Sequence, residues 1–253
     1  YEIRDLAKKL NIPAVETLMA RGVMGDENPL FFGMLGMHGE YAANMAAHET
    51  DLLISLGARF DDRVTGRLDE FASKAKVIHI DIDPTSIAKL VVADYPIVGD
   101  LKLTVEAMIE DSENYEINDF SNWVELLKDY REKEPLRYID TDDLIKPQWP
   151  IQRVGKILGD NAIISTDVGQ HQMWTAQFFP FSHPRQWITS GGLGTMGFGL
   201  PAALGAARAF KGTNRVVVNF TGDGSILMNI QELMTCSEYE LPVINIVLNN
   251  NYL

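Results

Sequence analysis

The sequence has little cysteine and a shortage of cations, and each shortage excludes a class of protein. The one cysteine, Cys236, allows no disulfide within the chain, and inside a predicted helix it is interpreted as a packed apolar thiol rather than a nucleophile. The 22 lysines and arginines against 35 aspartates and glutamates give a net charge of −13. This charge opposes binding to nucleic-acid backbones and anionic lipid surfaces, so we expect no nucleic-acid and no membrane partner.

Long apolar runs, a signal-peptide layout, internal repeats and low-complexity segments are absent as well. Because no run approaches the ~20 residues of a membrane-spanning helix, we expect a cytoplasmic protein, or a plastid or mitochondrial one in a eukaryote. The 253 residues, 46% of them hydrophobic, suffice for about two globular domains. The chain has no initiator Met, opens inside an amphipathic pattern and stops directly after a predicted strand, so we expect a fragment of a longer protein.

Two apolar runs that each end in small polar residues are the most informative feature. Val216–Phe220 precedes Thr-Gly-Asp-Gly-Ser, Val243–Leu248 precedes three asparagines, and apolar residues at helical spacing lie between the runs. The pattern predicts a strand, a helix and a parallel strand, whose polar ends meet at one sheet edge. Carboxylate and amide oxygens suit Mg²⁺, and Gly222 and Gly224 let backbone N–H groups approach an anion. An ordinary aspartate turn is the alternative for the Gly-Asp-Gly triplet.

The chain divides into two α/β blocks with a polar stretch between them. The spacing predicts a Rossmann-like doubly wound parallel sheet over residues 1–110, a linker with a helix over 111–150, and a second α/β domain over 151–253. Strands are expected at 12–15, 30–35, 51–56, 77–82 and 162–166. Trp123, Leu126, Leu127 and Tyr130 predict a helix packed on a neighbour.

Further polar loops follow the predicted strands of both blocks. In the second block, Gln170 and His171 are candidate phosphate donors, or else caps of the next helix. A glycine-rich loop over 190–201 has a Rossmann phosphate loop as its competitor, but its glycines follow no clear strand in the pattern and Met196 interrupts them. In the first block, Arg59 and Arg63 suit a phosphate, unless neighbouring aspartates simply neutralise them in a solvated ion-pair loop.

Taken together, these motifs resemble the acetolactate synthase (acetohydroxyacid synthase) large catalytic subunits, a family of thiamine diphosphate-dependent enzymes. The spacing from Gly-Asp-Gly to Asn-Asn resembles the family's thiamine diphosphate motif, and the run 59–66, Arg-Phe-Asp-Asp-Arg-Val-Thr-Gly, is the most specific piece. The resemblance implies part of a central FAD-binding domain over 1–110 and the N-terminal part of the thiamine diphosphate domain over 151–253.

The resemblance also implies a set of site residues. Mg²⁺ would be held by Asp223, Asn250 and the backbone carbonyl of Tyr252. Thiamine diphosphate would contact Gln170, His171, Gly194, Met196, Gly224 and Ser225. FAD would contact Thr17, Leu18, Met19, Leu35, Gly36, Met37, His38, Gly57, Ala58, Arg59, Asp61, Arg63, Val64, Asp81, Ile82 and Asp100. Arg63 would also steer the carboxylate of a second ketoacid, whereas the family's catalytic glutamate lies outside this chain.

The implied activity is a thiamine-dependent transferase reaction in branched-chain amino-acid biosynthesis. Pyruvate would condense with a second 2-ketoacid, pyruvate or 2-ketobutyrate, with loss of CO₂. The intact chain would form a homodimer or homotetramer, with a possible small regulatory subunit, and the fragment alone would be inactive. Alternatives are a glyoxylate carboligase-like enzyme and a catalytically silent cofactor-binding module. An NAD-dependent dehydrogenase is disfavoured, because the first block has no Gly-x-Gly-x-x-Gly turn after a strand.

Overall fold

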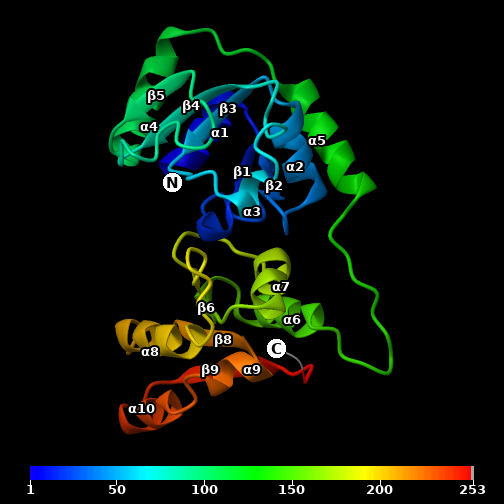
Figure 1. Cartoon of the computed structure of the whole chain (residues 1–253), viewed down its shortest axis with the longest axis vertical. Coiled ribbons are helices and arrows are strands. Elements are labelled where there is room, and N and C mark those ends of the chain that lie inside the picture. Colours follow the sequence, from blue (N-terminus) through cyan, green and yellow to red (C-terminus); the bar gives the residue numbers. More distant parts are fainter. Residues whose placement is uncertain (252–253) are drawn as a thin grey trace. The chain divides into compact units, whose positions relative to one another are not determined.

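The computed structural model describes residues 1–251, which divide into two compact units. Unit 1 comprises residues 1–17 and 27–135, and unit 2 comprises residues 18–26 together with the chain from 136 onward (Figure 1). Every strand pair that the described residues form is parallel, so the expected α/β class with parallel sheets is confirmed. Within these residues, no helix is both long enough and apolar enough to cross a membrane.

Unit 1 contains two parallel sheets, one of β1 and β2 and one in the order β3-β4-β5. Its elements are α1 (Glu2–Leu10), β1 (Ala14–Glu16), β2 (Phe31–Met34), α2 (Tyr41–Glu49), β3 (Leu52–Leu56), α3 (Asp62–Thr65), β4 (Lys76–Asp81), β5 (Tyr95–Val98), α4 (Leu101–Asp111), the 3₁₀ turn η2 (Ser112–Asn114) and α5 (Ser121–Lys133). The predicted strands are present with ends displaced by one or two residues. The pattern did not predict β5, since this short, exposed strand contains a proline.

Small residues let the helices of unit 1 approach closely. The buried face of α2 is made of alanines, and α2 packs against both β2 and α5. Tyr41 of α2 meets Tyr130 of α5 edge to face, with ring centroids 5.7 Å apart. Arg131 of α5 donates to the backbone carbonyl of Phe31, and its guanidinium lies over the ring of Phe32 at 4.8 Å. The helix predicted around Trp123 is therefore docked on its neighbours in unit 1.

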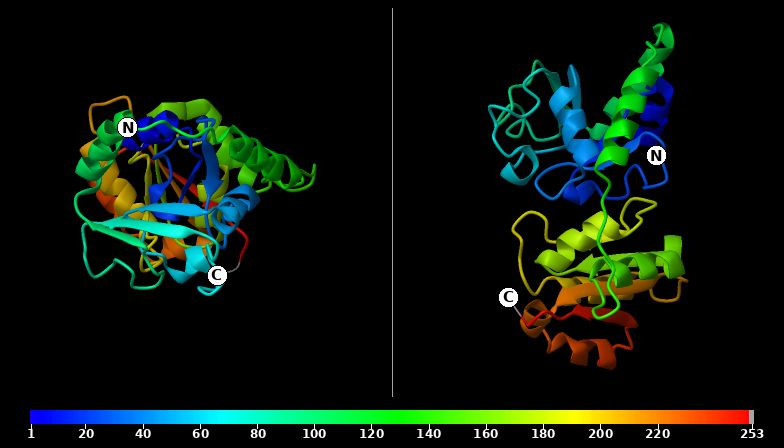
Figure 2. Two further views of the ribbon diagram at one scale, coloured as in Figure 1. Left: turned by 90° about the horizontal axis from the view of Figure 1, so that it is seen from above. Right: turned by 90° about the vertical axis from the view of Figure 1, so that its right-hand side faces the viewer.

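Unit 2 is built on one parallel sheet in the order β7-β6-β8-β9. Its elements are the 3₁₀ turn η1 (Leu18–Ala20), α6 (Gln148–Leu158), η3 (Gly159–Asn161), β6 (Ala162–Thr166), α7 (Gln170–Phe178), β7 (Trp187–Thr189), α8 (Gly199–Ala209), β8 (Val216–Gly222), α9 (Asp223–Leu227), α10 (Glu232–Glu238) and β9 (Val243–Leu248). Figures 1 and 2 show α6 and α7 on one side of this sheet and α10 on the other. Ile163 and Val217 form a core cluster with the alanines of α8.

Two predictions for unit 2 were wrong. One helix was expected between the last two strands, but the chain forms α9 and α10, separated by residues 228–231. Within that break, the Asn229 side-chain amide donates to the carbonyl of Gly197 at 2.7 Å, a distant contact that periodicity cannot register. The glycine-rich loop was expected to follow no clear strand, yet it directly follows β7. At three residues, β7 is too short to give a recognisable pattern.

Candidate functional site

The carboxyl ends of β6 and β8 are joined by the side chain of Asp167, the first residue after β6. Asp167 is fully buried, its Oδ2 atom accepts a hydrogen bond from the Thr221 hydroxyl at 2.9 Å, and its Oδ1 atom accepts one from the backbone N–H of Gly199 at 3.1 Å. Gly199 begins α8, and a side chain there would lie 2.6 Å from the backbone nitrogen of Asp167. Asp167 thus joins the ends of β6 and β8 to the start of α8, and these three parts of the chain form the floor of the sheet edge.

His171, in the first turn of α7, lies on this floor. A Cβ on Gly222 would lie 3.1 Å from the imidazole Cε1 and Nδ1 atoms, so the ring packs directly against the end of β8. The buried Nε2 atom of the ring has no hydrogen-bond partner among residues 1–251. Burial lowers the pKa of His171, and the carboxylates of Asp167 and Asp223 partly oppose that shift. His171 therefore presents an unsatisfied ring nitrogen at this edge.

Asp223 presents a second unsatisfied atom in the same place. It is the first residue of α9, and its buried Oδ1 atom has no hydrogen-bond partner among the described residues. The hydroxyl of Ser225 points back to the β6–α7 loop, donating to the Val168 carbonyl at 3.3 Å. A buried carboxylate oxygen without a donor is a ready cation ligand, so the residues present fit a metal ion.

The other two predicted metal ligands follow β9. Asn250 lies exposed just beyond β9, whereas Tyr252 lies outside the described residues. The described residues hold no cluster of three His, Cys, Asp or Glu side chains that could bind a metal by themselves. A metal at Asp223 would therefore need amide and backbone oxygens as its further protein ligands.

The glycine-rich loop borders the same edge. It is tied to the break between α9 and α10 by the hydrogen bond from Asn229 to Gly197, and internally by one from the Thr195 amide to the Ser190 hydroxyl at 3.0 Å. Of the two predicted cofactor contacts on this loop, Gly194 is exposed with φ +65° and Met196 is half-buried. The structure therefore brings five predicted thiamine diphosphate residues, His171, Gly194, Met196, Gly224 and Ser225, to one edge of unit 2, with Gln170 exposed beside them.

In unit 1, the predicted flavin contacts also gather at the carboxyl ends of strands. Residues 35–38 follow β2, residues 57–59 follow β3, Asp81 ends β4 with Ile82 directly after it, and Asp100 follows β5. The β2 loop meets the loop of α3, where the Met37 amide donates to the carbonyl of Arg63 at 2.7 Å. Thr17 belongs to unit 1, whereas Leu18 and Met19 belong by their contacts to unit 2.

Several carboxylates of that flavin set already have local roles. Asp61 caps α3 through the Arg63 amide at 3.1 Å, and Asp100 caps α4 through the Leu103 amide at 3.0 Å. The Asp81 carboxylate accepts from a backbone amide two residues further along, at 2.9 Å. The Arg63 guanidinium pairs with the exposed Asp62 at 2.8 Å. The Arg63–Asp62 pair matches the ion-pair alternative for Arg63, and an exposed pair of this kind is weak enough to open for a ligand.

Two buried residues of the structure were missed as functional candidates. Asp167 holds the floor of the unit 2 edge, and an aspartate directly after a buried strand is a signal that could have marked it. Arg21 has a side chain that is only 2% exposed and pairs with Asp26 at 2.8 Å. Local sequence gives no sign of that burial, because the residues around Arg21 come from a distant part of the chain.

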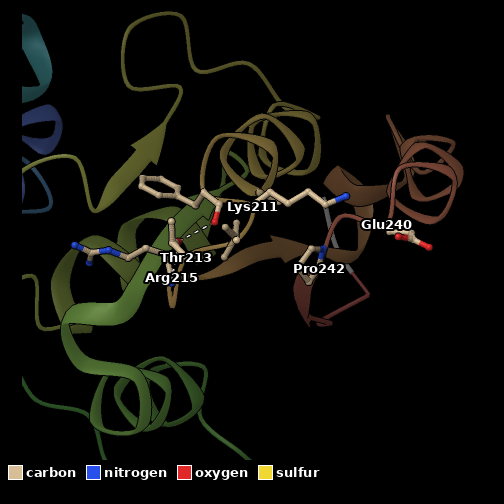
Figure 3. A pocket seen from close by; sticks show the side chains of 9 residues that line it. Lys211, Thr213, Arg215, Glu240 and Pro242 are labelled. Carbon is tan, nitrogen blue, oxygen red and sulfur yellow. Dashed lines mark hydrogen bonds between the residues drawn. The ribbon is translucent and has the colours of Figure 1, made fainter.

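A pocket of about 180 Å³ opens at the opposite end of the same sheet, beside the starts of β8 and β9 (Figure 3). Its cations have contacts elsewhere: Lys211 donates to the Tyr239 carbonyl at 3.2 Å, and Arg215 contacts His183 at 3.0 Å. Figure 3 shows the side chains of Lys211 and Arg215 extending in opposite directions. The charged side chains of this pocket therefore do not point toward a common ligand position, unlike the polar groups at the edge around Asp167.

Comparisons with known proteins find two thiamine pyrophosphate enzyme domains in the chain. Residues 1–108 match the family model described as thiamine pyrophosphate enzyme, central domain, and residues 167–253 match the thiamine pyrophosphate enzyme C-terminal TPP binding domain. The chain is 46% identical over 256 residues to the acetolactate synthase isozyme 3 large subunit of Escherichia coli (strain K12), covering 100% of this chain and 44% of that protein.

Plant relatives show a similar level of identity. The chain is 46% identical over 255 residues to the chloroplastic acetolactate synthase 1 of Nicotiana tabacum and 48% identical over 254 residues to the chloroplastic acetolactate synthase 2 of Brassica napus. All of this chain is covered in both, against 38% and 40% of those proteins, so the chain spans less than half the length of these relatives. The chain therefore belongs to the thiamine pyrophosphate enzymes, and over its whole length it is similar to acetolactate synthases.

Proposed function

We propose that the protein containing this chain is a thiamine diphosphate-dependent transferase, the catalytic subunit of an acetolactate synthase. It joins pyruvate to a second 2-ketoacid, pyruvate or 2-ketobutyrate, with loss of CO₂, and so supplies the synthesis of valine, leucine and isoleucine. The observation that carries the proposal is the pair of buried, unsatisfied atoms at one sheet edge, His171 Nε2 and Asp223 Oδ1. They suit an anionic diphosphate and its bridging cation, and the names of the relatives suggest the reaction.

The residues of the unit 2 edge divide the work of holding the cofactor. Asp223, Asn250 and the backbone carbonyl of Tyr252, which lies outside the described residues, would hold Mg²⁺. The backbone N–H groups of Gly224 and Ser225 would bind the diphosphate, together with the Gln170 side chain. Thiamine diphosphate, when bound, supplies the electron sink for decarboxylation and carbon–carbon bond formation.

His171 and the glycine-rich loop add orientation. An anion beside His171 would oppose the effect of burial and favour a proton on Nε2, from which the ring donates to a phosphate oxygen. The carbonyl of Gly194 would accept from the amino group of the aminopyrimidine, and Met196 would pack against the cofactor. Asp167 keeps this arrangement in place by bonding the end of β8 and the start of α8.

Unit 1 would hold FAD at the carboxyl ends of its strands. Glycine at residue 57, with φ +71°, exposes backbone that a flavin nucleotide could approach, and Arg59 nearby is exposed. Arg63 would steer the carboxylate of the second ketoacid after leaving Asp62. Arg63→Ala in the full-length enzyme should raise the KM for that ketoacid, and an unchanged KM would remove Arg63 from this role.

The intact protein would act as a homodimer or homotetramer. The bacterial relatives are named large subunits, which supports a small regulatory subunit as a further partner. We propose a cytoplasmic location, or a plastid or mitochondrial one in a eukaryote. The bacterial relatives and the relatives named chloroplastic support this proposal.

The test is made on the full-length protein. The flavin spectrum is recorded after denaturation, and acetolactate is assayed from pyruvate with and without thiamine diphosphate and Mg²⁺. Released FAD and acetolactate formation that needs both additions would support the proposal. Flavin without acetolactate would favour a glyoxylate carboligase-like enzyme, to be assayed with glyoxylate, or a silent cofactor-binding protein. Absence of flavin would overturn the FAD assignment of unit 1.

A further inference from the structure

Residues 18–26 form a segment that we call the strap. The strap leaves unit 1 after Thr17, and the chain returns to unit 1 at Glu27. Its contacts are with unit 2, to which Arg21 fastens it. The Arg21 Nε atom donates to the carbonyl of Ala176 at 2.9 Å, and Nη2 reaches both carboxylate oxygens of Asp26, at 2.8 and 3.0 Å. The strap is therefore closed on itself and tied to the last turns of α7.

Asp26 extends the attachment to the segment before β7. Its Oδ2 atom accepts from the amide of Phe181 at 3.1 Å, and its own amide donates to the Phe181 carbonyl at 2.8 Å. The Arg21 guanidinium lies 5.2 Å from the centroid of the Phe181 ring, which is fully buried and packs against Phe179 and Trp187. One ion pair thus joins the strap to two segments of unit 2.

The other end of the strap supports the glycine-rich loop. Leu18 and Met19 lie so close to Gly191 that a Cβ there would overlap the Met19 sulfur and lie 3.4 Å from Leu18 Cδ2. The strap also lies close to the main chain at Gly22, where a Cβ would be 2.5 Å from the carbonyl oxygen of His183 and φ is +92°. Gly191 stands three residues before Gly194, the residue expected to meet the aminopyrimidine.

The burial of Arg21 makes the attachment sensitive to either partner. A guanidinium removed from water is tolerated only when its charge and donors are satisfied, and loss of one partner leaves the other buried and unpaired. The side chain of Arg21 is 2% exposed, against 25% for that of Asp26. Disruption of this pair should therefore release the strap from unit 2, and with it the packing of Leu18 and Met19 beneath the loop.

We propose that the Arg21–Asp26 ion pair positions the glycine-rich loop for thiamine diphosphate by holding the strap against unit 2. Arg21 is a positioning residue that touches no cofactor atom in this scheme. The inference rests on the proposed function for its ligand, whereas the mechanical link from Arg21 to the loop stands on the contacts alone.

The experiment uses the full-length protein with Arg21→Met, Arg21→Lys and Asp26→Asn, and Val217→Ala as the control. Val217 is a buried residue of the same unit that packs with α8, away from the strap. Hydrogen exchange of residues 18–26 and 190–197 is followed by mass spectrometry without cofactors. The Kd for thiamine diphosphate is measured by calorimetry in the presence of Mg²⁺.

Arg21→Met should speed hydrogen exchange in both segments and raise the Kd for thiamine diphosphate by about tenfold or more. Arg21→Lys should partly restore both the exchange and the Kd. Val217→Ala should lower the Tm without either effect. Unchanged exchange at 190–197 in Arg21→Met, or equal weakening by Val217→Ala, would overturn the inference. If Arg21→Met does not fold, Asp26→Asn and Arg21→Lys carry the same comparison. A wild-type protein that binds no thiamine diphosphate would instead overturn the proposed function. The exchange measurement would still decide whether Arg21 holds the glycine-rich loop.

Discussion

Asp167 and Thr221 face each other across the ends of β6 and β8, where the threonine hydroxyl donates to the aspartate at 2.9 Å. Both side chains are fully buried. Asp167 also accepts from the amide of Gly199, so one carboxylate fixes two strand ends and the start of α8. This relationship holds the floor on which His171 and Asp223 stand.

Asp167→Ala should destabilise the protein by about 3 kcal/mol, because it leaves a buried hydroxyl and a buried amide without an acceptor. Thr221→Val removes only the donor of one of these bonds and should cost about 1 kcal/mol. Urea or thermal unfolding of both variants measures these changes in the free energy of unfolding. As a matched control, the exposed Asp140→Ala should change stability by less than about 0.5 kcal/mol. A smaller loss in Asp167→Ala than in Thr221→Val would contradict this account.

Gly222→Ala should weaken thiamine diphosphate several-fold while leaving the fold intact. The backbone of Gly222 is extended, with φ −91°, so the new methyl group causes no backbone strain but presses on the His171 ring from 3.1 Å. Gly205→Ala is the matched control: Gly205 is an exposed residue of α8 with open space around it. That change should stabilise the protein by roughly 0.5–1 kcal/mol and leave the Kd unaltered. Equal Kd values for the two variants would argue against a role for the ring.

Asp223→Asn should separate metal binding from folding. The wild-type carboxylate holds a buried oxygen without a partner, so its replacement by an amide should not lower the Tm of the cofactor-free protein. The gain in Tm on adding Mg²⁺ and thiamine diphosphate should shrink or vanish, and EDTA should abolish that gain in the wild type. An undiminished gain in the variant would exclude Asp223 as a ligand.

The Cys236 thiol should react slowly at ordinary pH. Burial, and then the nearby carboxylate of Glu232, raises the pKa of Cys236 above its usual value of 9.0. A raised pKa means that less thiolate is present at any given pH, so the midpoint of the alkylation rate should lie above 9.0. The rate of iodoacetamide labelling at this residue is followed by mass spectrometry across the pH range. Glu232→Gln should shift the midpoint downward, and a wild-type midpoint below 9.0 would refute the prediction.

Strands with a largely apolar run were predictable from the sequence. The runs at 162–166 and 243–248 have the same bounds in the structure, because β-branched residues favour strands both in the buried β6 and in the partly exposed β9. The position of Asp223 followed from the same reasoning, since the polar ends of parallel strands meet at one edge. The roles of the site residues themselves stay predictions.

Features that depend on distant contacts were not predictable. The break between α9 and α10 depends on Asn229 reaching Gly197, and the burial of Arg21 depends on Ala176 and Phe181. Neither contact leaves a local periodicity. Short strands such as β5 and β7 could not be predicted for a different reason: three or four residues carry too few side chains to establish an alternation.

The strap also decides how this protein can be dissected. Because residues 18–26 lie within the sequence of unit 1 but pack in unit 2, no single cut of the chain separates the two units. A truncated protein beginning at residue 136 would lose the partner of Phe181 and the filling beside Gly191, and would expose buried aromatic surface. Recombination, domain swaps or expression trials that treat residue 135 as a boundary should therefore give insoluble products unless the strap is supplied with its host.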